Sequence, residues 1–258
     1  MRIVSLAPSN TEILYALGVE DQVVAVTRFC DWPLEAKQKT QIGAWINTEP
    51  EKLRELEPDL IMTSYFKPKA LEGWSGPGEV LHVAPLTMWE VFESIRTIGQ
   101  AIGRTQRAEA VVQEMRDGFD RLWAARPEQS ARVYMEEWFH PPMAAGNWVP
   151  ELVALAGGEE VVADPGKPSA EFPFAALAMA DPDLMVCHWY GWGERTNPTL
   201  VLERDGWQEL RVVRAGRVHF INDSFINRPG PRLVEGAVAL QKIFTGGVSG
   251  HSLGPEVY

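Results

Sequence analysis

Short apolar runs alternate with amphipathic segments along the whole chain. Ser9 followed by Glu12 forms a capping-box pattern, which predicts the start of the first helix. The apolar runs are typical of buried strands, and the amphipathic segments have helical spacing. We expect strands at residues 3–7, 23–27, 60–63, 80–84, 132–136, 184–187, 217–221 and near 161, and helices at 10–17, 50–56, 150–156 and 175–179. Strands that alternate with helices predict an α/β fold with parallel sheets flanked by helices.

Two sequence echoes suggest that the halves of the chain are built alike. Residues 53–66 read LRELEPDLIMTSYF and residues 177–190 read LAMADPDLMVCHWY, so both contain Pro-Asp-Leu, an apolar run and two aromatics. Residues 12–20, EILYALGVE, resemble residues 151–159, ELVALAGGE. Both echoes occur in the same order in each half, which predicts two similar lobes.

The middle of the chain is the most helical part. A helix is expected at residues 89–101, and a second at 106–125, where apolar residues recur on one stripe and Pro127 ends the helix. About 20 residues would form a rod of roughly 30 Å. We therefore expect an N-terminal lobe at 1–102, a linking backbone helix at 103–127 and a C-terminal lobe at 128–258, with a ligand cleft between the lobes and only modest closure.

Aromatic residues follow most of the predicted strands. In parallel sheets, ligands bind beyond the carboxyl ends of the strands, so these positions are candidate binding residues. Tyr190 and Trp192 lie just beyond the same strand as two of the candidates. The candidates chosen on this ground are Phe29, Trp32, Trp45, Tyr65, Phe66, Trp138, His140, Trp148, His188 and Trp189. Several aromatics around one site suit a broad, largely apolar ligand.

Charge and composition exclude some classes of binding partner and location. The net charge of −11 argues against nucleic acid, since phosphate contacts need clustered Lys and Arg. No apolar stretch reaches the roughly 18 residues needed to span a bilayer. The first seven residues are too short for a signal-peptide core, so we expect a cytoplasmic monomer, or a periplasmic or cell-surface protein if the N-terminus is trimmed or misassigned. Cys30 and Cys187 are expected to be free thiols, a disulfide between them being the alternative.

Catalytic motifs are weak in this sequence. It has no glycine-rich phosphate loop and no Gly-x-Ser-x-Gly motif. Glu136 and Glu137 are adjacent on a predicted strand and should point to opposite faces. The histidines are not spaced as metal ligands, although His140 or His188 could ligate a metal carried by a ligand. We expect no catalytic residues, no intrinsic cofactor and no bare metal ion.

Four segments carry a resemblance to a known family. They are RIVSLAPSNTEILYALG at 2–18, TRFCDWP at 27–33, GAWINTEPEKLRELEPDLI at 43–61 and GWQELRVVRAGRVHFIND at 206–223. Together they resemble the substrate-binding proteins of ABC importers for cobalamin and iron siderophores, the type with a helical backbone. The resemblance covers nearly the whole chain and implies two α/β lobes joined by a helix, with the ligand between them.

The resemblance also implies roles for particular residues. Phe29 and Trp45 correspond to positions that line the family's corrin site. The loop DSFINRPGPR implies three further contacts, Ser224, Phe225 and Arg228. Docking on the permease uses one surface Glu per lobe in this family, which implies Glu51 here. In the second lobe, Ala175 stands at the matching place, and Glu171, four residues earlier, is the docking candidate there.

The function expected from these observations is non-catalytic binding of cobalamin or another corrinoid. The protein would act as an ABC-importer receptor or as a cytosolic relative that stores, carries or senses its ligand. A ferric siderophore or haem is the alternative ligand, with Arg28, Lys67, Arg195 and Arg228 available for anionic groups. A chelatase-like metalloenzyme is the alternative of a different class, and an interaction module centred on the apolar residues 172–174 is a third.

Overall fold

The chain folds into two compact units. The computed structural model describes residues 1–44, 47–195 and 197–246. The first unit comprises Met1–Pro85 and Trp89–Glu114, and the second comprises Leu86–Met88 and the chain from Met115 onward. The two units are therefore not two consecutive halves of the chain, because residues 86–88 belong to the second unit although the residues on both sides of them belong to the first.

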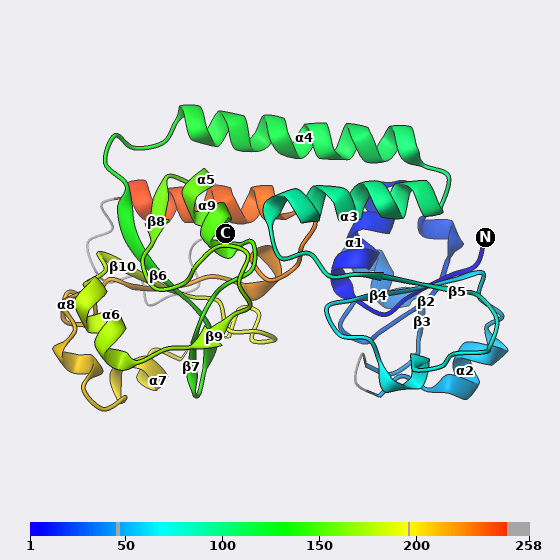
Figure 1. Cartoon of the computed structure of the whole chain (residues 1–258), viewed down its shortest axis with the longest axis horizontal. Helices are drawn as coiled ribbons and strands as arrows, with labels where there is room; N and C mark the ends of the chain where they lie inside the picture. The colour runs from blue at the N-terminus through cyan, green and yellow to red at the C-terminus, as the bar shows by residue number, and fades with distance from the viewer. Residues whose placement is uncertain (45–46, 196, 247–258) are drawn as a thin grey trace. The chain divides into compact units, whose positions relative to one another are not determined.

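The first unit contains a parallel sheet of five strands in the order β3-β2-β1-β4-β5 (Figure 1). The strands are β1 (Ile3–Ser5), β2 (Val23–Val26), β3 (Thr40–Gln41), β4 (Leu60–Ser64) and β5 (Glu79–Val83). Ile3 of β1 pairs with Val23 on one side and with Leu60 on the other. The chain thus builds outward from β1 in both directions, which confirms the predicted parallel α/β arrangement for this unit.

Helices cover the sheet of the first unit. They are α1 (Pro8–Ala16), α2 (Pro50–Glu55) and α3 (Met88–Ala101), the last beginning at a residue of the second unit. Leu53 of α2 packs with Val4 and Ile61 of the central strands. The predicted capping box is wrong: Ala7 is the N-cap of α1 and Pro8 opens the first turn, because proline's fixed φ suits that position.

The long helix predicted in the middle of the chain is confirmed as α4 (Thr105–Ala124). Its apolar stripe, including Ala108, Val112 and Phe119, is buried. The boundary between the two units lies inside this helix, between Glu114 and Met115. No helix among the described residues combines the length and the apolar character that crossing a membrane requires.

The second unit contains a mixed sheet in the order β11-β10-β6-β7-β9, with β8 also paired to β6. Its strands are β6 (Ala131–Phe139), β7 (Pro142–Ala144), β8 (Gly158–Glu160), β9 (Ala170–Glu171), β10 (Leu184–Cys187) and β11 (Val218–Phe220). The strands β11, β10, β6 and β8 pair in parallel as predicted, and the sheet also contains two antiparallel pairings, because β6 turns back into β7, which pairs with β9. Trp138 and Phe139 therefore lie inside β6 rather than beyond it.

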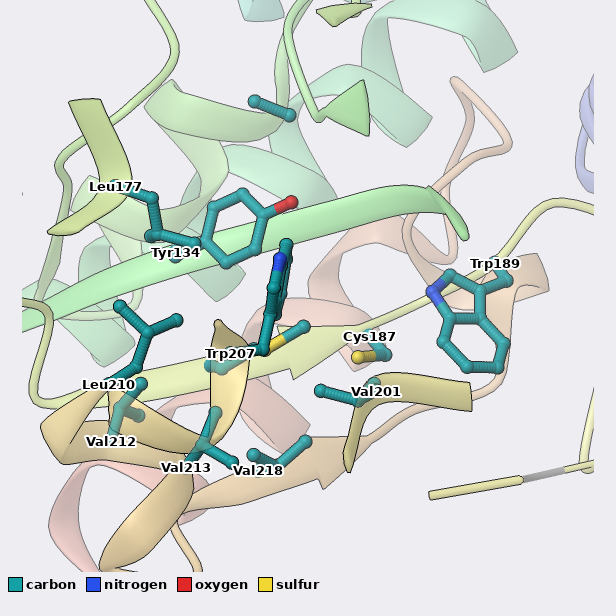
Figure 2. Close-up of a cluster of buried hydrophobic side chains, with 12 residues drawn as sticks. Tyr134, Leu177, Cys187, Trp189, Val201, Trp207, Leu210, Val212, Val213 and Val218 are labelled. Carbon is teal, nitrogen blue, oxygen red and sulfur yellow. The ribbon is translucent and has the colours of Figure 1, made fainter. Parts of the chain in front are cut away.

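A buried cluster fills one face of this sheet (Figure 2). Tyr134 and Cys187 of the central strands meet Trp207 and residues of the short helices that follow β9 and β10. Those helices are α6 (Phe174–Ala180), α7 (Thr199–Leu202) and α8 (Arg211–Arg214). The rings of Tyr134 and Phe172 meet edge to face at 5.2 Å. Large aromatics thus supply much of the apolar area buried in this unit.

Two further helices belong to the second unit. They are α5 (Val149–Leu155), expected from the sequence, and α9 (Leu233–Thr245), which we did not predict. The two helices contact each other, and α5 packs on β8. Gln241 of α9 donates a hydrogen bond to the carbonyl of Leu122 in α4 over 2.8 Å. The last helix thereby closes the core of the unit.

Candidate functional site

Exposed aromatic side chains gather at the carboxyl edge of the first sheet. Phe29 and Trp32 follow β2 and are each 41% exposed, while Tyr65 and Phe66 follow β4 and are 39% and 54% exposed. Between β1 and β4 the chain changes the side on which it adds strands, and ligands of open α/β sheets bind at such a switch point. These four predicted candidates are therefore brought to one edge of the sheet.

Tyr65 adopts an unusual backbone conformation. Its φ is +59°, in the left-handed region that bulky residues rarely occupy. The strand ends here with a tight reversal, in which the Phe66 amide donates to the Ser64 carbonyl over 2.6 Å and the Tyr65 amide donates to Val83 over 3.3 Å. The Tyr65 and Phe66 rings meet edge to face at 5.4 Å. Strained residues of this kind cluster at functional sites.

The loop after β2 presents Phe29 next to a cation. The Arg28 guanidinium lies 4.9 Å from the centre of the Phe29 ring. The next residue, Cys30, is buried, and its sulfur lies 3.3 Å from the Thr27 hydroxyl. The buried Cys30 side chain fixes the loop to the core, while the Phe29 ring stays exposed to solvent. Trp45, the remaining aromatic candidate of this unit, lies outside the described residues.

In the second unit, Trp138 lies near the end of β6 and His140 lies in the turn between β6 and β7. The Trp138 indole is half-buried and donates to the His140 carbonyl over 2.9 Å, while the His140 side chain is exposed. Trp138 packs on Phe139, whose ring centre lies 5.4 Å from that of Trp189. Trp192 completes the cluster, 5.0 Å from Trp189. The aromatics of this edge thus form one connected group.

Trp148, His188 and Trp189 are buried inside the second unit. The Trp148 indole donates to the Ile226 carbonyl over 2.9 Å, and the Trp189 indole donates to Glu136 over 2.8 Å. Both indole nitrogens are thus hydrogen-bonded within the fold. In this structure they support the edge rather than form its surface.

His188 is paired on one ring nitrogen only. Its Nδ1 lies 2.5 Å from the Asn227 side-chain oxygen, and Asn227 donates in return to the His188 carbonyl over 3.1 Å. Its Nε2 is buried and has no hydrogen-bond partner within the part of the chain that the structure describes. Burial lowers the pKa of His188 to about 4, so the ring is neutral at physiological pH.

The loop after β11 holds the candidates taken from the family resemblance. Ser224 is nearly buried, and its amide donates to the Asn222 side chain over 2.9 Å. Phe225 is half-buried with the Arg232 guanidinium 4.3 Å from its ring centre, and Arg228 is half-buried. The residue before Ser224 is Asp223, whose carboxylate accepts hydrogen bonds from the amides of Gly191 and Gly193, a role that no sequence motif indicated.

The docking candidates are surface residues. Glu51 lies in the first turn of α2 and Glu171 on β9, and both are exposed. Ala175, at the place where a docking Glu was expected, is exposed on α6. The surface of α6 is therefore apolar, with Phe174 40% and Met179 85% exposed.

The adjacent carboxylates Glu136 and Glu137 have different hydrogen-bond partners. Glu136 accepts from Tyr134 and Trp189, whereas Glu137 accepts from the Ser169 hydroxyl, so the two adjacent residues have separate surroundings as predicted. Burial raises the pKa of Glu137, against the hydrogen bond from Ser169. Across residues 1–44, 47–195 and 197–246, no group of three or more His, Cys, Asp or Glu side chains is arranged to hold a metal ion.

The family model described as "Periplasmic binding protein" matches residues 3–224 of the chain. An uncharacterized ABC transporter substrate-binding lipoprotein of Bacillus subtilis, YvrC, is 28% identical over 252 residues, covering 93% of this chain and 78% of the relative. A vitamin B12-binding protein of Vibrio parahaemolyticus is 24% identical and covers 94% and 89%. The solved periplasmic heme-binding protein RhuT from Roseiflexus sp. RS-1 is 24% identical, with a TM-score of 0.79 over 94% of this chain and 97% of that one, and shows the same fold.

These findings correct one expectation and confirm another. The cytoplasmic location expected from the N-terminal residues is wrong, because the matching family is periplasmic and one relative is a lipoprotein, which places such proteins outside the cytoplasm. The resemblance to ABC-importer substrate-binding proteins is confirmed. With the matched region covering most of the chain, the protein belongs to the periplasmic binding protein family, the non-catalytic solute-binding proteins of ABC importers.

Proposed function

We propose that this protein is the receptor of an ABC importer, binds cobalamin or another corrinoid as cargo, and catalyses no reaction on it. The observation that carries the proposal is the exposed aromatic edge of the first unit, formed by Phe29, Trp32, Tyr65 and Phe66. The vitamin B12-binding relative, which aligns over nearly the whole chain, supports the same ligand class.

The exposed aromatics favour a broad, partly apolar ligand on energetic grounds. Covering apolar surface gains about 25 cal/mol per Å², and each aromatic side chain offers on the order of 150–250 Å². Leaving several such rings in water forgoes this gain, so a gathering of them is typical of a binding surface. A corrin macrocycle is broad enough to cover several rings of this size at once.

Calorimetric titration with cyanocobalamin tests the proposal. We expect micromolar or tighter binding, and Phe29→Ala and Tyr65→Ala should each weaken it about tenfold, the loss of one good aromatic contact. Trp89→Ala is the matched control, because Trp89 is 59% exposed but lies on α3. Absence of binding to cyanocobalamin, with the fold intact, would exclude the corrinoid. Trp45→Ala tests the remaining candidate of this unit in the same way.

Haem is the second candidate ligand, and a particular residue favours it. The Tyr65 phenol belongs to a side-chain type that can hold haem iron, and it stands on the exposed edge. Titration with hemin, followed by visible absorbance, distinguishes the ligands. If haem binds through iron, Tyr65→Phe should change the spectrum of the complex; if the ring only stacks, Tyr65→Phe should leave it unchanged. A ferric siderophore, held by cations such as Arg28, is compared in the same titration.

We further propose that Glu51 and Glu171 contribute to docking on the permease. Both carboxylates are exposed, one on each unit, so each is available to a cationic partner surface. Glu51→Lys and Glu171→Lys should each reduce stimulation of the transporter's ATPase activity in liposomes without changing ligand affinity. Glu128→Lys is a control at an acidic position on neither α2 nor β9. Equal stimulation by all variants would contradict this docking role.

A further inference from the structure

The segment that follows β10 exposes an aromatic side chain directly after two buried residues. Tyr190 is 46% exposed, whereas Trp189 before it is 3% exposed and His188 is fully buried. The segment lies next to the end of β6, since the Tyr190 amide donates to the Glu137 carbonyl over 3.0 Å. Between β6 and β10 the second sheet changes the side on which strands are added, which is the preferred place for a ligand.

Hydrogen bonds from three directions fix this segment. On one side the Asp223 carboxylate accepts from the amides of Gly191 and Gly193 over 2.9 and 2.7 Å. On another, Asn227 pairs with both the ring and the carbonyl of His188. From within the core, Glu136 accepts from the indole of Trp189. These hydrogen bonds fix the backbone conformation at Tyr190 in the absence of a ligand.

Gly191 and Gly193 allow the backbone to adopt a left-handed conformation in this loop. Their φ values are +76° at Gly191 and +58° at Gly193, in the left-handed region that favours glycine. An added Cβ at either position would lie within 4 Å of no other atom of the described chain, so space is not the reason for glycine. The left-handed turns direct both amides at the oxygens of Asp223. The sequence Tyr-Gly-Trp-Gly thus encodes a loop built around one carboxylate.

We propose that Tyr190 is a ligand-contacting residue that determines specificity in the second unit, and that Asp223 is the positioning residue that sets its geometry. The inference rests on the proposed binding function and extends it, because the sequence had indicated the buried Trp189. A ring on a fixed backbone loses little conformational entropy when a ligand covers it. The entropic cost of binding is therefore smaller, and the affinity is higher.

The surroundings of Asp223 give this arrangement a pH dependence. Burial raises the pKa of Asp223, against the hydrogen bonds from Gly191 and Gly193 and the positive charge of Arg228. Glu137 is the neighbouring acid, and its charge interacts with that of Asp223. Protonation of Asp223 would weaken its hold on the two amides. Ligand affinity should therefore decline on acidification as the loop loses its fixed geometry.

Calorimetric titration of the full chain with cyanocobalamin, hemin and a ferric siderophore tests the contact. Tyr190→Ala should weaken binding of the ligand that wild type takes by about tenfold, and Tyr190→Phe should retain most of the affinity if the ring face is the contact. Trp123→Ala, a 48% exposed aromatic on α4, is the matched control. Unchanged affinity in Tyr190→Ala overturns the inference while the proposed function stands. If wild type binds none of the three ligands, both are overturned together.

A double-variant comparison tests the positioning role. Asp223→Asn leaves one acceptor oxygen for two amides and should weaken binding several-fold, with a faster dissociation rate and a smaller decline of affinity on acidification than wild type. In a Tyr190→Ala background, Asp223→Asn should have little further effect, because it acts through Tyr190. Fully additive losses would show that Asp223 acts on the fold at large and would overturn its positioning role.

Discussion

The Glu136 carboxylate and the Arg204 guanidinium form a two-point ion pair inside the second unit. Nη1 of Arg204 lies 2.7 Å from one oxygen, and Nη2 lies 2.8 Å from the other. Glu136 is fully buried and Arg204 is 12% exposed. Arg204 also donates to the Phe139 carbonyl and lies over the Trp207 ring, so it ties the segment after α7 to the end of β6.

Removing the cation alone should strongly destabilise the second unit. Burial raises the pKa of Glu136, and the hydrogen bonds from Arg204 oppose that shift. Arg204→Met leaves the carboxylate without its cation and should lower the free energy of unfolding by about 3–5 kcal/mol, measured by urea denaturation. The double variant Glu136→Gln, Arg204→Met should recover part of this loss. Lys52→Met, at an exposed pair with Glu49, should cost less than about 1 kcal/mol.

Replacing the strained Tyr65 with glycine should raise the stability of the protein but weaken ligand binding. A left-handed conformation costs an ordinary residue about 1–2 kcal/mol, which Tyr65→Gly relieves at the expense of greater freedom in the unfolded chain. We expect Tyr65→Gly to raise the free energy of unfolding by several tenths of a kcal/mol and to weaken ligand binding about tenfold. Glu57→Gly is the matched control, since Glu57 has a φ of +43° but lies after α2. It should gain stability with unchanged binding; a loss of stability in both variants would contradict the strain.

Glu160 predicts that stability declines as the solution becomes alkaline. Its carboxylate accepts from the amides of Met135, Val162 and Ala163, yet burial raises its pKa from 4.5 to about 8. Between those values the folded state keeps a proton that the unfolded state has released, so unfolding becomes more favourable as pH rises, by up to about 1.4 kcal/mol per pH unit. Thermal unfolding at pH 7 and pH 8 should show this trend, and Glu160→Gln should flatten it. A wild-type midpoint that rises over this interval would contradict the assignment.

His188 predicts a loss of stability in acid. Its pKa is about 4 in the folded state against 6.5 for the free side chain, so below pH 6.5 the unfolded state binds the additional proton. Stability should therefore fall as pH falls from 6.5 towards 4. His188→Asn can retain a hydrogen bond to Asn227 and carries no titrating ring, so its unfolding midpoint should depend less on pH in this interval. An unchanged dependence would assign the acid sensitivity to other groups.

Periodicity and turn residues in the sequence were sufficient to predict most of the regular elements. The apolar stripe of α4 and the short apolar runs of β1, β4 and β10 depend on local spacing, which the sequence states directly. The hairpin of β6 and β7 could not be predicted, because Pro141 and Pro142 argue against strands, and Pro142 is tolerated only as the first residue of β7. The strands β7 and β9 exist because they pair with neighbours, not because of their own composition.

The candidate site, like the fold, could be predicted from the sequence only in part. The sequence by itself determined that aromatics follow the strands, and chain direction in a parallel sheet then brings Phe29, Trp32, Tyr65 and Phe66 to one edge. Only the tertiary structure decided which rings remain outside. Trp189 and Tyr190 are adjacent and chemically alike, but the buried Glu136 carboxylate draws the indole inward, and the bonds between Asp223 and the two glycines leave the phenol at the surface. Exposure depends on partners distant in the sequence, and no local pattern encodes them.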